Sequence, residues 1–296
     1  MSGPEVVLSQ VPVTSARSLA EAYAVLARRQ PGLTVLAGGT DLMVQLYAGL
    51  GLSRLGPVLD LWRVPELRGL TVAGGVLRIG ALATYSALIQ SPLVAAHLPA
   101  LAAVSREVGA WAIQNRGTIG GNICNASPAG DTLPLLLAAD AQFVLGGPRG
   151  ERAVAAADFW VAYRKTALAA DELLLRAEVP LGYQLVYRKV GTRRAQSISK
   201  TLIAVRAKVA AGGALNEVRV AAGCVAPTPI RCRGAEAALE GRAPDEAAIT
   251  AARLALQQDI KPIDDVRSDA EYRRRVSANV LARLLRELGA GAGRPA

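Results

Sequence analysis

Apolar residues recur at two different spacings in the first 180 residues, and these spacings predict helices that alternate with strands. Apolar residues at 19, 22, 23 and 26 would share one face of a helix that is capped by Ser18 and Glu21. The Gly74-Gly75 pair between two short apolar runs predicts a β-hairpin. The other expected strands cover 6–8, 33–36, 58–61, 141–145 and 172–179, and the other expected helices cover 84–89 and 92–108.

The pattern changes after Pro180, where strands are expected to follow one another without helices between them. A run of strands followed by a run of helices is typical of an antiparallel sheet flanked by helices. We therefore expect a separate, smaller C-terminal domain that ends in a loose Gly/Ala-rich tail. Its strands are expected over 183–189, 201–210 and 218–224, and its helices over 234–240, 245–258 and 268–288.

Two glycine pairs, Gly38-Gly39 and Gly120-Gly121, have threonine and either aspartate or asparagine beside them. We expect each pair to follow an apolar strand, and Asp131 to cap a helix with Pro134 in its first turn. Glycine allows positive φ and a close approach to the main chain, and free N–H groups in such a bend bind anions. Two such bends predict a diphosphate held from two sides, although an ordinary turn explains either bend equally well by itself. The pairs at 74–75, 146–147 and 212–213 are expected to be turns.

The two bends do not match the common nucleotide-binding sequences. Gly-Gly-Thr-Asp differs from both G-x-G-x-x-G and the Walker pattern, and the first bend follows the second strand of its unit rather than the first. An NAD-type Rossmann domain is therefore disfavoured, while a dinucleotide ligand is still compatible with the sequence.

Composition narrows the class of protein. The chain has 296 residues, of which 51% are hydrophobic and 20% charged, which is enough to form the cores of about two domains. It has no run that could span a bilayer, no signal-peptide pattern and only three cysteines, so we expect a cytoplasmic protein without membrane insertion. The net charge of +10 is spread along the chain and aromatic residues make up 4%, which disfavours nucleic-acid binding. An acidic partner subunit or an anionic cofactor fits this charge better.

No residue stands out as a catalyst or a metal ligand. His97 is the sole histidine, which excludes a His-rich metal site and disfavours a Ser-His-Asp triad. Cys124 has no nearby base in the sequence and is interpreted as a small residue packed under a ligand. Asp140 and Asp264-Asp265 are expected at helix caps or loop ends rather than in a carboxylate pair. Residues 187–200 hold five cations, which suits either a solvated loop or a cation beside a flavin or a phosphate.

Together these residues resemble the flavin-binding (medium) subunit of the molybdenum hydroxylases, the family of xanthine dehydrogenase and carbon monoxide dehydrogenase. The resemblance covers nearly the whole chain, and its motifs occur in the same order as in that family. The matching segments are 37–42, 118–123, 126–128 with Asp131, 163–166, Lys189 with Arg193-Arg194 and Ile198, 264–267, and 271–273.

The resemblance implies an α+β protein with the two-subdomain FAD-binding fold of the PCMH/vanillyl-alcohol-oxidase type. The subdomains would cover 1–60 and 61–182, followed by a C-terminal α+β domain over 183–290 and a loose tail over 291–296. FAD would bind to this chain, with both glycine segments around the pyrophosphate, Asp131 at FAD hydroxyls and Ile198 near the isoalloxazine. No catalytic residue and no metal ligand is implied. The implied cofactor-binding residues are Val35, Leu36, Ala37, Gly38, Gly39, Thr40, Asp41, Leu42, Val108, Thr118, Ile119, Gly120, Gly121, Asn122, Ser127, Asp131, Leu174, Lys189 and Ile198.

The way in which this family distributes the reaction among its subunits implies the function of this chain. In such proteins a large molybdopterin-binding subunit oxidises the substrate, a small subunit with two [2Fe-2S] clusters carries the electrons, and FAD passes them to NAD+ or another acceptor. The resemblance thus implies the FAD subunit of a heterotrimer, arranged as a dimer of heterotrimers, with a xanthine dehydrogenase-like function as the first expectation. A carbon monoxide, aldehyde or N-heterocycle dehydrogenase is the alternative. A stand-alone flavin oxidoreductase and a non-enzymatic nucleotide-binding module are less favoured.

The chain departs from some members of the family in two places. It lacks the four-cysteine insertion of the benzoyl-CoA reductase branch. Some eukaryotic-type members have Arg-Arg-Glu-Asp-Asp where this chain has Arg-Arg-Ala-Gln-Ser at 193–197, so a preference for NAD+ does not transfer to it.

Overall fold

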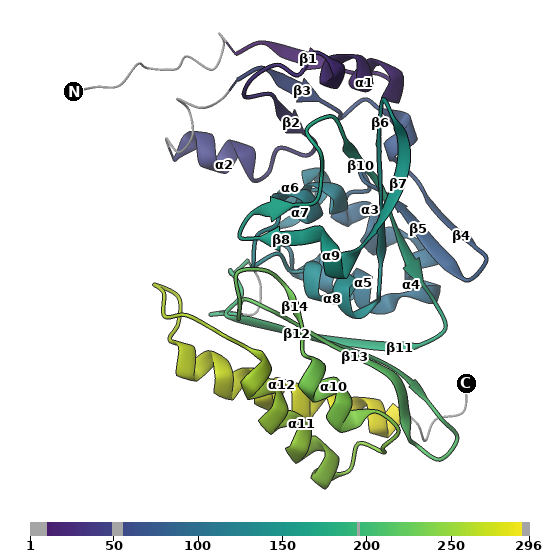
Figure 1. Cartoon of the computed structure of the whole chain (residues 1–296), viewed down its shortest axis with the longest axis vertical. Helices are drawn as coiled ribbons and strands as arrows, with labels where there is room; N and C mark the ends of the chain where they lie inside the picture. Colours follow the sequence, from purple (N-terminus) through teal and green to yellow (C-terminus); the bar gives the residue numbers. More distant parts are fainter. Residues whose placement is uncertain (1–10, 49–55, 194–195, 292–296) are drawn as a thin grey trace.

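The structure, a computed structural model, describes residues 11–48, 56–193 and 196–291. Three main sheets follow one another along the long axis of the molecule, with helices beside and between them (Figure 1). The predicted α+β class is confirmed by this arrangement. The division into domains at 60/61 and 182/183 stays a prediction. Of the tail expected at 291–296, Gly291 ends the last helix and the other residues lie outside the described ranges.

The first sheet is parallel and has the order β1 (Val13–Ser15), β3 (Val58–Asp60), β2 (Thr34–Leu36). Helix α1 (Leu19–Ala27) connects β1 to β2, and α2 (Leu42–Tyr47) follows β2. The predicted start of α1 is confirmed, because Ser18 Oγ accepts the N–H of Glu21 at 3.2 Å. The strand expected at 6–8 lies outside the described residues.

The second sheet is antiparallel and has the order β4 (Leu70–Ala73), β5 (Val76–Gly80), β10 (Leu173–Pro180), β6 (Gln142–Gly147), β7 (Gly150–Ala155). The hairpin at Gly74-Gly75 is confirmed, since both glycines have positive φ between paired strands. The turn expected at Gly146-Gly147 is wrong, because both residues pair within the sheet. Gly146 instead allows close packing, since a Cβ there would lie 2.6 Å from the hydroxyl of Tyr23.

Short helices pack against the second sheet. The long apolar segment expected over 92–108 forms two of them, α4 and α5. The helices and small elements of this region are α3 (Tyr85–Gln90), α4 (Pro92–His97), α5 (Pro99–Glu107), α6 (Trp111–Arg116), α7 (Ile119–Asn125), α8 (Leu133–Ala138), α9 (Ala156–Phe159), the 3-10 turn η3 (Pro65–Leu67), and the hairpin strands β8 (Trp160–Ala162) and β9 (Lys165–Thr166).

Two expectations about the second glycine segment are wrong. Gly120 and Gly121 follow helix α6 rather than an apolar strand, and both lie inside the first turn of α7. Asp131 does not cap α8, whose N-cap is Thr132 without a side-chain hydrogen bond. The physical reason is that the Asp131 carboxylate is already bonded to two side chains from the C-terminal part of the chain.

The third sheet is antiparallel, as predicted, with the order β11 (Gln184–Val190), β12 (Thr201–Val209), β13 (Leu215–Gly223), β14 (Ile230–Arg231). One of its faces packs on α10 (Arg233–Leu239) and α12 (Ala270–Gly291), and the other faces α8 (Figure 1). Helix α11 (Glu246–Asp259) packs against α10 and α12. The alternation along β12 explains both contacts. Ile203 and Val205 point to the C-terminal helices, and Ala204 between them points to the core around α8.

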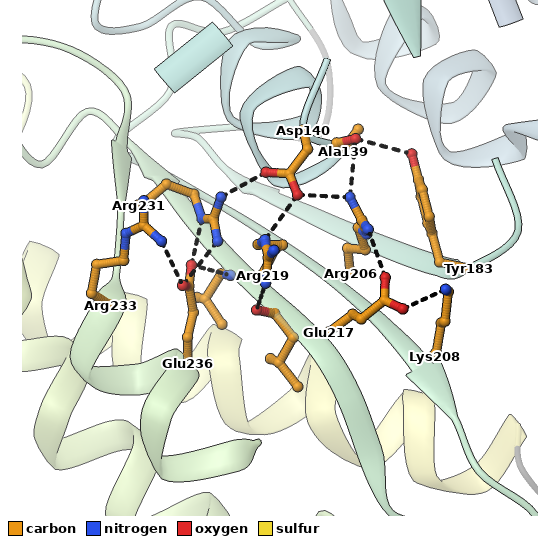
Figure 2. A network of polar contacts seen from close by, with 12 residues as sticks. Ala139, Asp140, Tyr183, Arg206, Lys208, Glu217, Arg219, Arg231, Arg233 and Glu236 are labelled. Carbon is orange, nitrogen blue, oxygen red and sulfur yellow. Dashed lines mark hydrogen bonds and ion pairs between the residues drawn. The ribbon is translucent and has the colours of Figure 1, made fainter. Parts of the chain in front are cut away.

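A network of ions joins the third sheet to the rest of the chain (Figure 2). Asp140, in left-handed conformation at φ 51°, accepts from Arg206 at 3.0 Å, Arg219 at 2.9 Å and Arg231 at 2.8 Å. These arginines come from three neighbouring strands, β12, β13 and β14. Asp140 is thus a loop-end residue, as predicted, and its charge holds the third sheet against α8.

Candidate functional site

Two adjoining cavities lie between the first sheet, the helices α6 and α7, and the loops of the third sheet. The smaller one has a volume of about 460 Å³ and the larger one about 980 Å³. They share Asp41, Ile113, Asn122 and Asn125 in their walls, so an elongated ligand can occupy both.

The first glycine segment, residues 37–41, connects β2 to α2 and lines the smaller cavity. Gly39 has a φ of 78°, which glycine adopts readily and other residues rarely do. The N–H groups of Gly38, Gly39 and Thr40 have no acceptor among the residues that the structure describes. Consecutive unpaired N–H groups form a concave site for an anion. This segment therefore has the donor set that a phosphate requires.

The second glycine segment, residues 118–123, differs, because the N–H groups of both its glycines are already bonded. Gly120 N–H donates to Ala81 O at 2.9 Å, and Gly121 N–H donates to Thr118 Oγ at 3.0 Å. Gly120 serves packing, since a Cβ there would lie 2.6 Å from Ala81 O. Gly121 faces the first segment across the smaller cavity, where a Cβ would be 4.0 Å from the Cβ of Ala37. The expected run of free N–H groups is thus present in the first segment and absent from these residues of the second.

An anionic linker fits between the two segments. The first segment offers N–H groups that have no acceptor among the described residues. In the second segment, Gly121 leaves the main chain accessible because it has no side chain. The apolar part of the smaller cavity, with Leu61, Leu82 and Leu174 in its wall, suits a planar ring system. The two cavities together thus have the donors and the apolar walls that a dinucleotide requires.

A buried ion pair closes the larger cavity. Lys189 Nζ donates to Asp131 Oδ2 at 2.6 Å and to the carbonyl oxygen of Glu107 at 3.1 Å, and Ser199 Oγ donates to Asp131 Oδ1 at 2.7 Å. The side chains of Lys189 and Asp131 are only 6% and 10% exposed, so Lys189 does not belong to a solvated loop. Burial raises the pKa of Asp131, and the charge and hydrogen bond of Lys189 oppose that rise. The pair brings together residues that lie 58 positions apart in the sequence.

Most of the predicted site residues line the two cavities. Ile119 does not, because it is fully buried at the start of α7. Lys189 lines neither cavity and is connected to the larger one through its bond to Asp131. The smaller cavity is lined by Val35, Leu36, Ala37, Gly38, Gly39, Thr40, Asp41, Leu42, Val108, Thr118, Gly120, Gly121, Asn122 and Leu174, and the larger one by Asp41, Asn122, Ser127, Asp131 and Ile198.

The two residues considered for catalysis behave differently in the structure. Cys124 lines the smaller cavity, and burial raises the pKa of its thiol to about 12, which favours the protonated thiol over the nucleophilic thiolate. His97 is exposed at the end of α4 and lines neither cavity. Among the described residues, no group of three or more His, Cys, Asp or Glu side chains could hold a metal ion.

Sequence reasoning missed several residues of the site. Arg164 lines the larger cavity and bonds to Asn125, and Tyr85 and Gln45 line the smaller one. Arg164 belongs to a motif that supported the resemblance, but no spacing in the sequence places it near the glycine segments.

In the described part of the chain, no helix has the length and apolar character that a membrane span needs.

Comparisons with known proteins agree with this geometry. Residues 9–182 match the family model described as "FAD binding domain in molybdopterin dehydrogenase", and residues 186–288 match "CO dehydrogenase flavoprotein C-terminal domain". The chain is 33% identical to the carbon monoxide dehydrogenase medium chain of Hydrogenophaga pseudoflava over 91% of this chain and 93% of the relative. It is also 33% identical to the xanthine dehydrogenase FAD-binding subunit of Escherichia coli O157:H7, over 94% of this chain and 96% of the relative.

A solved structure shares the whole fold. It is the carbon monoxide dehydrogenase from Hydrogenophaga pseudoflava that lacks the Mo-pyranopterin moiety of the molybdenum cofactor, with a TM-score of 0.86, 34% identity, and coverage of 92% of this chain and 95% of the matched chain. The predicted fold and family are thereby confirmed. The chain belongs to the family of FAD-binding domains of the molybdopterin dehydrogenases and is a flavoprotein subunit of the carbon monoxide and xanthine dehydrogenase type of oxidoreductase.

Proposed function

We propose that this chain holds FAD across the two cavities and passes electrons from a partner subunit to an acceptor. The observation that carries this proposal is that the N–H groups of Gly38, Gly39 and Thr40 have no acceptor in the described part of the chain, and that these residues line a cavity that the second glycine segment also lines. These groups would bind the diphosphate, with Thr118, Gly120, Gly121 and Asn122 opposite them. FAD, when bound, supplies the capacity to accept and donate electrons.

The remaining site residues would orient the cofactor. Val35, Leu36, Val108 and Leu174 supply apolar contacts in the smaller cavity. In the larger cavity, Asp131 and Ser127 offer oxygens to hydroxyl groups, and Ile198 offers an apolar surface to the flavin ring. Lys189 would hold the Asp131 carboxylate in place, because its ammonium group is bonded to one of the two oxygens.

We infer that the electrons come from another chain. A [2Fe-2S] cluster takes four thiolates, and this sequence has three cysteines, which are all free and of which two are buried. We infer a small subunit with two [2Fe-2S] clusters and a large molybdopterin-binding subunit, assembled as a dimer of heterotrimers. Large apolar side chains on the wall of the larger cavity support such an interface, since Val44, Tyr163, Ile198 and Ile263 are 55–68% exposed.

We also propose candidates for the substrate of the complex and for the electron acceptor. Xanthine is the first substrate to test, and carbon monoxide, aldehydes and N-heterocycles are the alternatives, because the two relatives named above are equally similar to this chain. NAD+ is the first acceptor to test, with oxygen and quinones as alternatives. We also propose that the protein works in the cytoplasm, since reduced, unpaired cysteines are typical of that compartment.

The experiment is reconstitution of the full chain with FAD. Flavin absorbance that stays with the protein after gel filtration supports the proposal. The Gly39→Val variant should lose this absorbance, because a φ of 78° is strained for valine and a Cβ at 39 would lie 3.3 Å from the Leu36 side chain, which would distort the first glycine segment. Gly212→Val is the matched control, since a Cβ there meets no atom within 4 Å. A colourless chain that cannot be reconstituted would overturn FAD binding and favour another nucleotide-binding module.

The role in electron transfer needs a second measurement. The chain should co-purify with a cluster-bearing and a molybdopterin-bearing subunit, and its flavin should be reduced only in their presence when xanthine or carbon monoxide is added. An isolated chain that oxidises a small organic substrate at full rate would instead identify a stand-alone flavin oxidoreductase.

A further inference from the structure

Arg164 lies where the two cavities join. It belongs to the two-residue turn between β8 and β9, and its guanidinium reaches the end of the first glycine segment and the end of α7, the helix that contains the second. Nη1 donates to Asn125 Oδ1 at 2.9 Å and lies 3.7 Å from Asp41 Oδ2. Asp41 ends the first segment, and Asn125 is the last residue of α7. Arg164 therefore spans the cleft between the two segments.

The conformation of Arg164 is unfavourable for arginine. Its φ is 52°, in the left-handed region, which costs free energy for a residue with a Cβ and which glycine adopts without that cost. The ion pair does little to compensate, because the side chains of Arg164 and Asp41 are 40% and 47% exposed. Folding alone thus gives arginine no advantage over glycine at this position. Residues held in such conformations are concentrated at functional sites.

We propose that Arg164 is a positioning residue that ties Asp41 to Asn125 and slows the release of the cofactor from between the glycine segments. This proposal rests on the proposed function, because it takes FAD as the ligand. Arg164 would act through the two segments it joins. Its removal lets their ends separate, while the N–H groups of Gly38, Gly39 and Thr40 keep their positions on the first segment. The effect is therefore expected in the rate of dissociation.

The Arg164→Gly variant separates this role from a purely structural one. We expect the variant without cofactor to be as stable as the unmodified chain or more stable, because glycine relieves the left-handed strain. FAD release should become about two-fold to five-fold faster, the size expected for the loss of an exposed charged contact. Release is measured as the return of free-flavin fluorescence after dilution of the FAD-loaded full chain, and stability is measured by urea unfolding.

Arg29→Gly is the matched control. Arg29 also has a left-handed φ, of 46°, and an exposed side chain, and it pairs with Asp171 at 3.2 Å. It lines neither cavity, so the variant should gain the same relief of strain without any change in FAD release. A change in release as large as that of Arg164→Gly would overturn the proposal.

A double variant tests the contact through which Arg164 acts. If Arg164 works by holding Asn125, then Arg164→Gly combined with Asn125→Ala should release FAD no faster than the faster of the two single variants. Fully additive effects would overturn the proposed coupling.

The outcomes also separate this proposal from the proposed function. If the unmodified chain does not retain FAD, then FAD binding fails and the role of Arg164 fails with it. If the unmodified chain retains FAD and Arg164→Gly releases it at the same rate, then only the role of Arg164 is overturned. A parallel loss of stability and of FAD in Arg164→Gly would indicate a structural role and would also overturn it.

Discussion

Gly38 lies directly against the main chain of Arg116, so closely that a Cβ at position 38 would be 1.9 Å from the Arg116 carbonyl oxygen. This contact joins the first glycine segment to Arg116, the last residue of α6. Only Gly117 separates Arg116 from Thr118, where the second segment begins. The Arg116 guanidinium also stacks on Trp62, 3.7 Å from the ring centroid, just after β3. The width of the cleft is therefore set by a contact between two backbones.

The first prediction concerns this contact. Gly38→Ala should lower the free energy of unfolding by about 2 kcal/mol and reduce FAD retention, because the backbone oxygen of Arg116 cannot rotate away from the new methyl group. Gly212→Ala, at a site with open space around it, should change stability by less than about 0.5 kcal/mol. Urea unfolding and bound-flavin absorbance measure the two effects. Equal stability of the two variants would show that the cleft adapts to a side chain at 38.

The second prediction concerns the buried pair of Lys189 and Asp131. Lys189→Met should lower the free energy of unfolding by about 3 kcal/mol, because it leaves the Asp131 carboxylate buried without its cation. Lys208→Met removes a lysine of similar size from an exposed pair with Glu217 and should cost less than about 1 kcal/mol. The double variant Lys189→Met with Asp131→Asn should be more stable than Lys189→Met alone, because no unpaired charge is then buried. A double variant that is less stable than Lys189→Met would contradict this explanation.

The third prediction concerns Asp140, on which three arginines converge. Asp140→Asn keeps the shape of the side chain and tolerates the left-handed backbone, so it tests the charge alone. It should lower the free energy of unfolding by about 3 kcal/mol, since Arg206 and Arg231 are only 8% and 7% exposed. Hydrogen exchange should accelerate first in β12 and β13. Glu217→Gln, which removes a more exposed partner of Arg206, should cost less than about 1 kcal/mol, and an equal cost would refute the special role of Asp140.

The fourth prediction concerns pH. Glu172 lines the smaller cavity, and its hydrogen bonds from Arg152, at 2.7 and 2.8 Å, hold its pKa below the usual value. A lowered pKa in the folded state means that the ion pair stabilises the fold above about pH 5, and that this contribution is lost as the pH falls through the lowered pKa. Arg152→Met should therefore reduce stability at neutral pH, and the difference from the unmodified chain should shrink below about pH 4.

The check is urea unfolding of both proteins across this pH range. Arg283→Met, which breaks an exposed pair with Glu287, should have a small effect throughout. A difference between Arg152→Met and the unmodified chain that stays constant from neutral to acid pH would rule out Glu172 as its source.

Local patterns in the sequence predicted most elements, because their causes are local. The cap at Ser18, the turn at Gly74-Gly75 and the strands of the third sheet all follow from residues that are close together in the chain. The wrong predictions concern residues whose conformation depends on contacts with distant parts of the chain. Gly146 looked like part of a turn, but it lies within a strand because Tyr23 and Leu175 pack against it.

The site was predicted in outline but not in its chemistry. Both glycine segments line one cavity, as two bends around one ligand require. Their similar sequences nevertheless concealed a difference, since Gly120 donates to Ala81 while Gly38 has no acceptor among the described residues. This difference depends on whether a distant carbonyl group such as that of Ala81 lies within reach, and the sequence of either segment does not show this.

The sequence by itself determined the elements, the family, and the two segments that would hold a dinucleotide, because caps, turns and motifs depend on neighbouring residues. Only the tertiary structure decided which N–H groups are free, that Lys189 and Asp131 form a buried pair, and that Arg164 joins Asp41 to Asn125. The physical reason is that hydrogen bonds and burial depend on atoms brought together by the fold, and these atoms belong to residues far apart in the chain.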